Sequence, residues 1–368
     1  MKLQDNRLAG YGLLRRPSMA FKYGVRISLI ATLLLLGYDG ASSIAAQEQI
    51  TGEWIINTRP GTDSIHLTIS RGGGRHFNMS TSDVRLDSIK GLSQALAASS
   101  GSPVQFQIVR DAGTLNCEGW FKNGRGSGHF TFTPDQSFVS EMGSLGYRDL
   151  SNEKVFSMAV LDVSRAFARD LNALGYTSLS TDELMAMRIH GATPQFINEL
   201  KAAGYDRLPS DQLIAMRIHG VTPEFIREIS AAGYERQQVD QLLAMRIHGV
   251  STEFMKELQA LGYDRQPIDQ LVAMRIHGVK GEFMRELQEM GYGRVPIDQL
   301  VAMRIHGVST DFIKELKTFG YDRVPVDQLV AMRIHGVNAA FIQKARDRGY
   351  KDLSIEELVD LRIHGFDK

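Results

Sequence analysis

Several features are scarce or missing in this sequence of 368 residues. A single cysteine, Cys117, excludes an intramolecular disulfide framework and any zinc site built from cysteines. The 42 Lys and Arg residues are balanced by 42 Asp and Glu residues, which argues against a dedicated nucleic-acid binder. No convincing enzyme signature is found. We therefore expect a non-enzymatic protein that uses no cofactor.

The first 46 residues have the order of a secretory signal. Six basic residues precede an apolar run at 27–36, and small residues follow as far as Ala46. The run is shorter than the roughly 20 residues that span a bilayer. We predict that 1–46 is a signal peptide and that the mature protein, with a net charge of −4, is periplasmic or extracellular. The long basic leader leaves an uncleaved N-terminal membrane anchor as an alternative.

Residues 47–142 alternate between apolar and polar positions, as strands with one buried face do. An apolar stripe within 87–98 predicts one short helix. The segment therefore reads as a small antiparallel β domain that holds both tryptophans, Trp54 and Trp120, in the core or half exposed. The alternating apolar residues are Ile65, Leu67, Ile69, Val104, Phe106, Ile108, Phe130 and Phe132.

Two groups in this domain could suggest chemistry. The glycine-rich stretch 124–128 lacks the Lys-Ser/Thr pair of a phosphate-binding loop, so a β-hairpin turn is favoured. His66, His76, His129 and Glu118 could gather around a metal ion, but no ligand spacing demands it. We predict no metal site.

Residues 143–368 repeat with a period of 29 residues. Gly-Tyr pairs, Arg-Ile-His-Gly motifs and single phenylalanines all recur at this step. Each unit contains two short helical patterns, here called helix A and helix B. In the unit that starts at Gly262, helix A is predicted over 269–277, with Leu271, Val272, Met274 and Ile276 on its apolar side. Helix B is predicted over 282–290.

The ends of these helices are marked in the sequence. Thr193-Pro194 and Thr222-Pro223 are N-caps followed by a proline in the first turn. Capping boxes begin at Ser180 and Ser354. Helix A ends at Arg-Ile-His-Gly, where we assign the histidine and glycine as C-caps. These structural caps are His190, Gly191, His219, Gly220, His248, Gly249, His277, Gly278, His306, Gly307, His335 and Gly336.

Two helices of about nine residues cannot bury an apolar face alone, so neighbouring units must stack. The first copy is degenerate, and the last stops after helix A at His364. Such atypical end copies are typical of caps. The predicted fold class is α+β with two domains: a small antiparallel β domain followed by an α-solenoid of helical hairpins.

Charged residues form rows across the repeats. Mixed rows most often pair between repeats, but a row of arginines could also line a groove that holds carboxylates or anionic glycans. The candidate binding row is Arg188, Arg217, Arg246, Arg275, Arg304 and Arg333. The histidine row could instead respond to pH or metals, although stacked helices lie about 8–10 Å apart, too far for adjacent histidines to share one zinc ion.

The pattern Gly-Tyr…Asp-Gln-Leu…Arg-Ile-His-Gly-Val resembles repeats in exported bacterial proteins, and is similar to the extracytoplasmic tails of BlaR/M56-type sensor proteins. The resemblance covers about 146–368. Those peptidases need His-Glu-x-x-His, which this chain lacks, so the resemblance implies no peptidase activity. The rhythm of the repeat also faintly resembles the helix-hairpin-helix DNA-binding motif, but its Gly-x-Gly hairpin and positive face are missing.

These observations favour an exported scaffold that binds a protein or peptide partner of the cell envelope through the surface of the solenoid. The first alternative is a cell-envelope carbohydrate binder that uses the tryptophans and arginine rows. The second is a protein whose histidine row senses pH or metal ions. No nucleic-acid partner and no stable membrane span after cleavage are expected.

Overall fold

The computed structural model describes residues 49–58, 63–71 and 77–366. The predicted signal peptide at 1–46 lies outside these residues. Among the helices that the described ranges contain, none combines the length and the apolar character needed to cross a bilayer.

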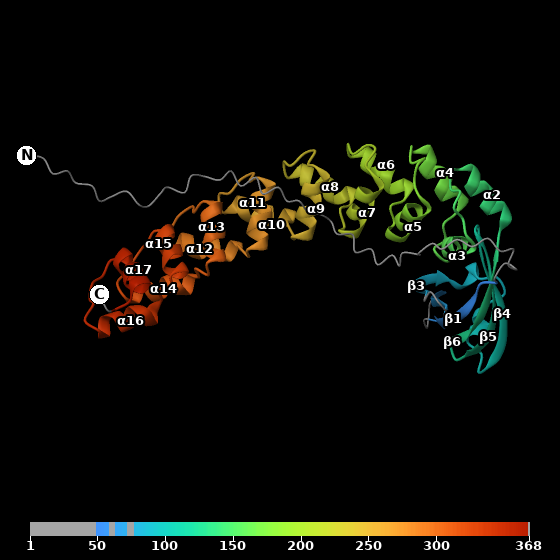
Figure 1. Cartoon of the computed structure of the whole chain (residues 1–368), viewed down its shortest axis with the longest axis horizontal. Helices are drawn as coiled ribbons and strands as arrows, with labels where there is room; N and C mark the ends of the chain where they lie inside the picture. Colours follow the sequence, from blue (N-terminus) through green and yellow to red (C-terminus); the bar gives the residue numbers. More distant parts are fainter. Residues whose placement is uncertain (1–48, 59–62, 72–76, 367–368) are drawn as a thin grey trace, which may run out of the picture. The chain divides into compact units, whose positions relative to one another are not determined.

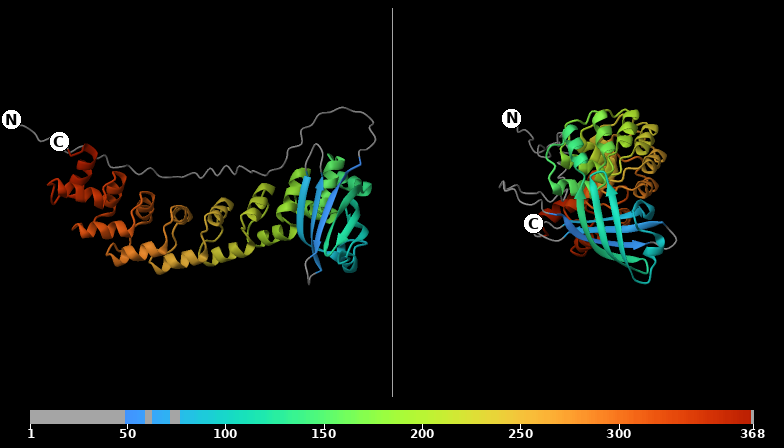
Figure 2. Two further views of the ribbon diagram at one scale, coloured as in Figure 1. Left: turned by 90° about the horizontal axis from the view of Figure 1, so that it is seen from below. Right: turned by 90° about the vertical axis from the view of Figure 1, so that its right-hand side faces the viewer.

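An antiparallel sheet forms the first part of the described chain, in the spatial order β3-β2-β1-β6-β5-β4. Figure 2 shows this sheet from two directions. The prediction of an antiparallel β domain is thereby confirmed. The strands are β1 (Thr51–Thr58), β2 (Ser64–Arg71), β3 (Phe77–Arg85), β4 (Ser102–Arg110), β5 (Gly113–Lys122) and β6 (Arg125–Pro134).

One face of the sheet carries the core of this domain. All eight of the alternating apolar residues that the sequence singles out are buried. Trp54 is completely buried, and its Nε1 donates to the carbonyls of Glu118 and His129 at 3.1 Å each. Its indole is therefore satisfied within the core and is closed to any ligand. Trp120 is 61% exposed on the opposite face.

Glycines in β5 and β6 make room for these large aromatic side chains. A Cβ at Gly119 would lie 2.6 Å from the Trp54 ring, and one at Gly126 would lie 2.6 Å from the Phe121 ring. The predicted turn at 124–128 is therefore too long. The hairpin turns at Asn123 and Gly124, both with positive φ, and the next glycines already belong to β6.

The predicted helix over 87–98 is wrong in extent. Only a 3-10 turn, η1 (Leu86–Ser88), and a four-residue helix, α1 (Gln94–Ala97), form there. Between them Lys90 exchanges two backbone hydrogen bonds with Gln107, at 2.8 and 3.0 Å, and Gly91 takes a φ of 90°. These tertiary bonds interrupt the helix, although Ile89 and Leu92 are buried as the apolar stripe predicts.

Sixteen helices follow within the described residues (Figure 1), and all but the first, α2, lie within the predicted helical region 143–368. They include α11 (Ile268–Ile276) and α12 (Gly281–Glu289), each within one residue of its predicted bounds. The others are α2 (Gln136–Ser144), α3 (Asn152–Val160), α4 (Arg165–Ala173), α5 (Thr181–His190), α6 (Pro194–Ala202), α7 (Ser210–Ile218), α8 (Pro223–Ala231), α9 (Val239–Ile247), α10 (Thr252–Ala260), α13 (Ile297–Ile305), α14 (Thr310–Thr318), α15 (Val326–Ile334), α16 (Ala339–Asp347) and α17 (Ile355–His364).

The helix ends are formed by the predicted residues. Thr193 and Thr222 accept hydrogen bonds at the N-termini of α6 and α8, and both capping boxes form, at Ser180 and Ser354. Gly262 has a φ of 85°, and the next amide, of Tyr263, bonds back to the Leu258 carbonyl at 2.9 Å. This is the Schellman arrangement expected at the Gly-Tyr stop.

Helices of the same kind pack against one another. A helices contact the A helix of the next unit along the whole series α5, α7, α9, α11, α13, α15 and α17. B helices do the same within the series α4, α6 and α8, and again within α10, α12, α14 and α16. Each helix thus finds its partners in the neighbouring units.

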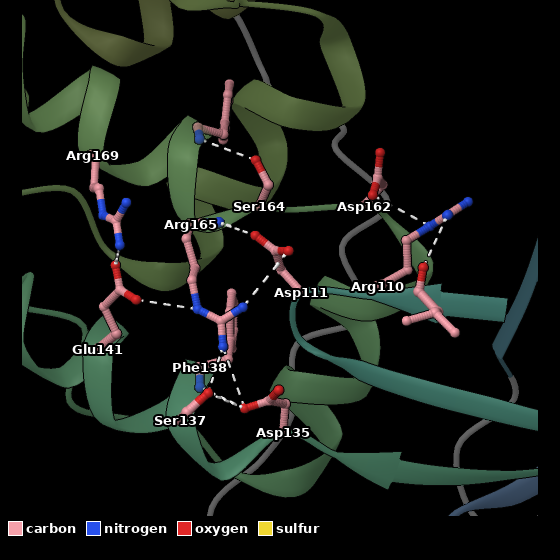
Figure 3. Close-up of polar contacts among 12 residues, drawn as sticks. Arg110, Asp111, Asp135, Ser137, Phe138, Glu141, Asp162, Ser164, Arg165 and Arg169 are labelled. Atoms are coloured by element: carbon pink, nitrogen blue, oxygen red, sulfur yellow. Dashed lines mark hydrogen bonds and ion pairs between the residues drawn. The ribbon is translucent and has the colours of Figure 1, made fainter. Parts of the chain in front are cut away.

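The first helices are joined to the sheet around Arg165 (Figure 3). Its backbone amide donates to Asp111 Oδ2 at 2.8 Å, and its guanidinium pairs with Asp111, Asp135 and Glu141. The guanidinium also lies 5.4 Å from the centre of the Phe138 ring. The predicted domain boundary at 142/143 falls inside α2, which contributes two of these contacts and also packs on α4.

Candidate partner-binding site

The arginines of the predicted binding row all turn back toward the preceding unit. Each guanidinium lies over the phenylalanine ring found 21 residues earlier, at 4.9–5.3 Å for the five from Arg217 to Arg333 and 5.9 Å for Arg188. Arg362, outside the predicted row, does the same over Phe341 at 5.0 Å. Cation–π contacts of this kind hold a helix A to the preceding helix B.

These arginines also approach the end of the preceding helix A. Arg217 Nε donates to the His190 carbonyl at 3.4 Å, and Arg188 donates to both the carbonyl and the carboxylate of Asp162 at 2.9 Å. A Cβ at Gly191 would lie 3.1 Å from Arg217 Nη2. The guanidinium thus adds positive charge at a helix C-terminus, where the dipole favours it. One face of each guanidinium is thus covered by the preceding unit, whereas the side chains from Arg217 to Arg333 stay exposed to solvent.

The predicted cap residues lie at the ends of the A helices. The six glycines have φ between 67° and 71°, the left-handed conformation that a C-cap glycine needs. The amide of His277 bonds to the Ala273 carbonyl at 3.0 Å, and the amide of Val279 bonds to the Met274 carbonyl at 2.8 Å. The imidazoles of the predicted cap histidines belong to no group of three or more potential metal ligands within the described ranges.

Sequence reasoning missed the role of the Gly-Tyr tyrosines. Six of them donate a hydrogen bond from the phenol to a backbone carbonyl 32 residues ahead, at 2.6–2.9 Å. At the end of the array, Tyr350 instead bonds to the Phe366 carbonyl at 3.0 Å. The constant 29-residue step was the available signal, because it keeps the acceptor carbonyl at a fixed place in the next unit.

The surface left open by these contacts carries a row of isoleucines. The isoleucine of every Arg-Ile-His-Gly motif is 43–54% exposed. Ile276 was expected on the buried side of its helix, and this expectation is wrong. The isoleucine row consists of Ile189, Ile218, Ile247, Ile276, Ile305, Ile334 and Ile363.

Helix geometry explains the exposure. The buried positions Leu271 and Met274 are three residues apart on one stripe, whereas Ile276 follows Met274 by about 200° around the helix. Asp269 precedes Ile276 by seven residues, so it lies on the same face about 10 Å along the axis. Ala273, half buried, lies between them. A row of exposed carboxylates therefore borders the isoleucine row: Asp182, Asp211, Asp240, Asp269, Asp298, Asp327 and Glu356.

The residues of the β domain that could have gathered around a metal ion do not form one cluster among the described residues. Glu118 and His129 are cross-strand neighbours, His66 lies opposite Asn57, and His76 falls outside the described residues. Cys117 is buried, and burial raises the pKa of its thiol to about 12. A thiol with this pKa has almost no reactive thiolate at neutral pH.

Comparison with known proteins gives no relative: no protein-family model, curated protein or solved structure matches the chain. The resemblance to BlaR/M56-type tails therefore stays a prediction.

Proposed function

We propose that this chain is a non-enzymatic, exported scaffold that binds a protein or peptide partner along the A helices of an α-solenoid. The solenoid is supported by the recurring contacts between successive A helices and by two repeated links between units. The first link is the tyrosine hydrogen bond, and the second is the arginine over the phenylalanine. A row of stacked hairpins presents a long surface with equivalent positions at regular intervals, which suits an extended partner.

The isoleucine row carries this proposal. Fully burying an isoleucine is worth about 1.5–3 kcal/mol, so a half-exposed one retains about 1 kcal/mol. Association costs at least about 4 kcal/mol in lost freedom, so one residue cannot hold a partner but several acting together can. An apolar row of this length points to a partner with apolar side chains of its own.

The acidic row adds to the chemistry of the partner. Asp269 and its equivalents are exposed and run parallel to the isoleucines. A peptide with apolar residues on one side and Lys or Arg residues along the other would complement both rows. The candidate partner is thus a basic, amphipathic segment of a protein in the cell envelope.

The location of the protein is supported by the sequence of 1–46 and by the buried state of Cys117, which suits an oxidising compartment. A second candidate function, binding of cell-envelope carbohydrate, is favoured by the exposure of Trp120. Among the residues that the structure describes, no group of ligands favours a metal-responsive histidine row.

Site-specific photocrosslinking in the native cell envelope tests the scaffold function. A photoreactive amino acid at Ile276 should yield a crosslinked protein, which mass spectrometry then identifies. The matched control places the same group at Glu282, an exposed position on the B helix α12. A triple variant, Ile247→Ser with Ile305→Ser and Ile334→Ser, should abolish the crosslink at position 276. Equal crosslinking at both positions, or none at position 276, would count against the proposal.

A further inference from the structure

The open face of the sheet carries a second feature, which is independent of the isoleucine row. Trp120 in β5 projects from this face and lies between Ser127 of β6 and Pro103 of β4 in a cross-strand row. Ile55 of β1, opposite Ser127, extends the row and is 44% exposed. The flat indole of Trp120 is thus exposed to solvent and takes no part in the core of the sheet.

A hollow of about 480 Å³ opens on the same face, between the next two cross-strand rows. One row is His129, Glu118 and Gln105, and the other is Thr131, Asn116 and Gln107. Glu118 precedes Trp120 by two residues in β5, so their backbone positions lie about 7 Å apart and their side chains share one face.

The polar groups of the hollow are partly organised already. Gln107 Nε2 donates to Asn116 Oδ1 at 2.8 Å, and Asn116 Nδ2 donates to Thr133 Oγ1 at 3.3 Å. Lys90, held by its backbone bonds to Gln107, closes the edge at β4. Amides that are fixed in this way offer donors and acceptors in defined directions at little entropic cost.

We propose that this face binds an uncharged oligosaccharide, with one ring stacked on Trp120 and the next lying in the hollow. A sugar ring has an apolar C–H face and a rim of hydroxyls, which matches an exposed indole beside amide and carboxylate groups. The ligand class follows from the charges as well. The charges on this face are mixed, because Glu118 and Glu53 are accompanied by Lys90 at the edge of the hollow and by Lys122 and Arg125 in the row beyond Trp120, so the face favours neither a polyanion nor a polycation. The backbone groups of this face are already paired within the sheet.

Intrinsic fluorescence gives a direct test, because the chain has only two tryptophans and Trp54 is completely buried. Chitotetraose and cellotetraose are added to the whole mature protein at millimolar concentration, with alginate as the polyanionic arm. At least one neutral sugar should shift the emission of Trp120 to shorter wavelength and protect it from acrylamide. A Trp120→Phe variant, in which Trp54 is the only tryptophan, should show neither effect when tryptophan is excited selectively.

Calorimetry of variants then locates the site. Trp120→Ala should weaken the binding of the active sugar by at least about tenfold, and Gln105→Ala should weaken it severalfold without touching the indole. Val109→Ala is the matched control, because Val109 is 50% exposed on the same face but does not line the hollow. Its affinity should equal that of the unmodified protein.

Three results would overturn the proposal. They are no response to either neutral sugar, a response to alginate alone, and binding that survives Trp120→Ala unchanged. A shift of the protein from dimer to monomer on Trp120→Ala, without any sugar binding, would assign the face to self-association instead. None of these results bears on the crosslinks at Ile276, so the two proposals can fail separately.

Discussion

The contact between Arg275 and Phe254 decides whether the arginine row holds the fold together or serves a ligand. The Arg275 guanidinium lies 5.1 Å from the centre of the Phe254 ring, which is almost fully buried. Phe254 belongs to one unit and Arg275 to the unit that follows it. A cation–π contact at a partly exposed site is worth about 0.5–1 kcal/mol. Arg275→Gln removes the charge and the planar stack, and should therefore destabilise this junction by about 1 kcal/mol.

Hydrogen exchange read at the amides of α10 and α11 is the suitable assay, because repeat arrays open locally as well as globally. A loss of 1 kcal/mol corresponds to exchange that is about fivefold faster. The double-mutant cycle of Arg275→Gln with Phe254→Leu should give a coupling energy of about 0.5–1 kcal/mol. Arg227→Gln is the control, since Arg227 is exposed and, among the described residues, pairs with Glu224 of its own helix.

A coupling energy indistinguishable from zero would refute this reasoning. The arginines would then be free to recognise carboxylates or anionic glycans, as the sequence alone allows. If Arg275→Gln left the exchange rates unchanged but removed the crosslink at Ile276, the row would belong to the binding surface. Faster exchange with an intact crosslink is the expected outcome.

Three further predictions concern backbone geometry and burial elsewhere in the chain. Gly249→Val should cost at least about 1 kcal/mol in thermal denaturation, because a β-branched residue is strained at a φ of 69° and its Cβ would lie 3.2 Å from Arg275 Nη2. Gly128→Ala should unfold the sheet, since its Cβ would lie 1.9 Å from the Glu118 carbonyl oxygen. Gly143→Ala in α2 is the contrasting variant, because its Cβ meets nothing within 4 Å and the change should stabilise the protein by about 0.5–1 kcal/mol. Thermal melts followed by circular dichroism check both. Burial raises the pKa of the Cys117 thiol from 9.0 to about 12, so the thiol ionises at lower pH in the unfolded state than in the folded state. The free energy of unfolding should therefore fall as the pH rises from 9.0 to about 12. The urea midpoint should fall less steeply over this pH range for Cys117→Ala.

The predictable part of the fold is the part set by neighbours in sequence. The bounds of α11 and α12, the capping box at Ser180 and the left-handed glycines depend on side chains and amides a few residues apart. The alternation that buries Phe130 and Phe132 is equally local, because it follows from the two faces of a strand. Each of these signals can be read without knowing which elements meet in space.

The other features depend on contacts between distant residues. The helix expected over 87–98 is interrupted because Lys90 pairs with Gln107. Trp54 and Trp120 look equivalent in sequence, yet one is completely buried beneath paired glycines and the other is 61% exposed. Nothing local shows that Arg275 reaches back to Phe254, so this contact could not be read from the sequence. The candidate sugar site likewise depends on the registers that place Gln105 opposite Glu118 and His129 beside it.

The Arg-Ile-His-Gly motif separates what the fold requires from what it leaves to function. In the motif that begins at Arg275, the arginine stacks on the preceding unit, while His277 and Gly278 end the helix. Ile276 is the apolar residue of this motif and is 43% exposed, and neither the helix end nor the stack on Phe254 requires an apolar side chain there. The same choice is made in all seven copies that the structure describes, and each isoleucine leaves 43–54% of its surface exposed. This exposed apolar area is the part of the motif that the proposed partner would bury.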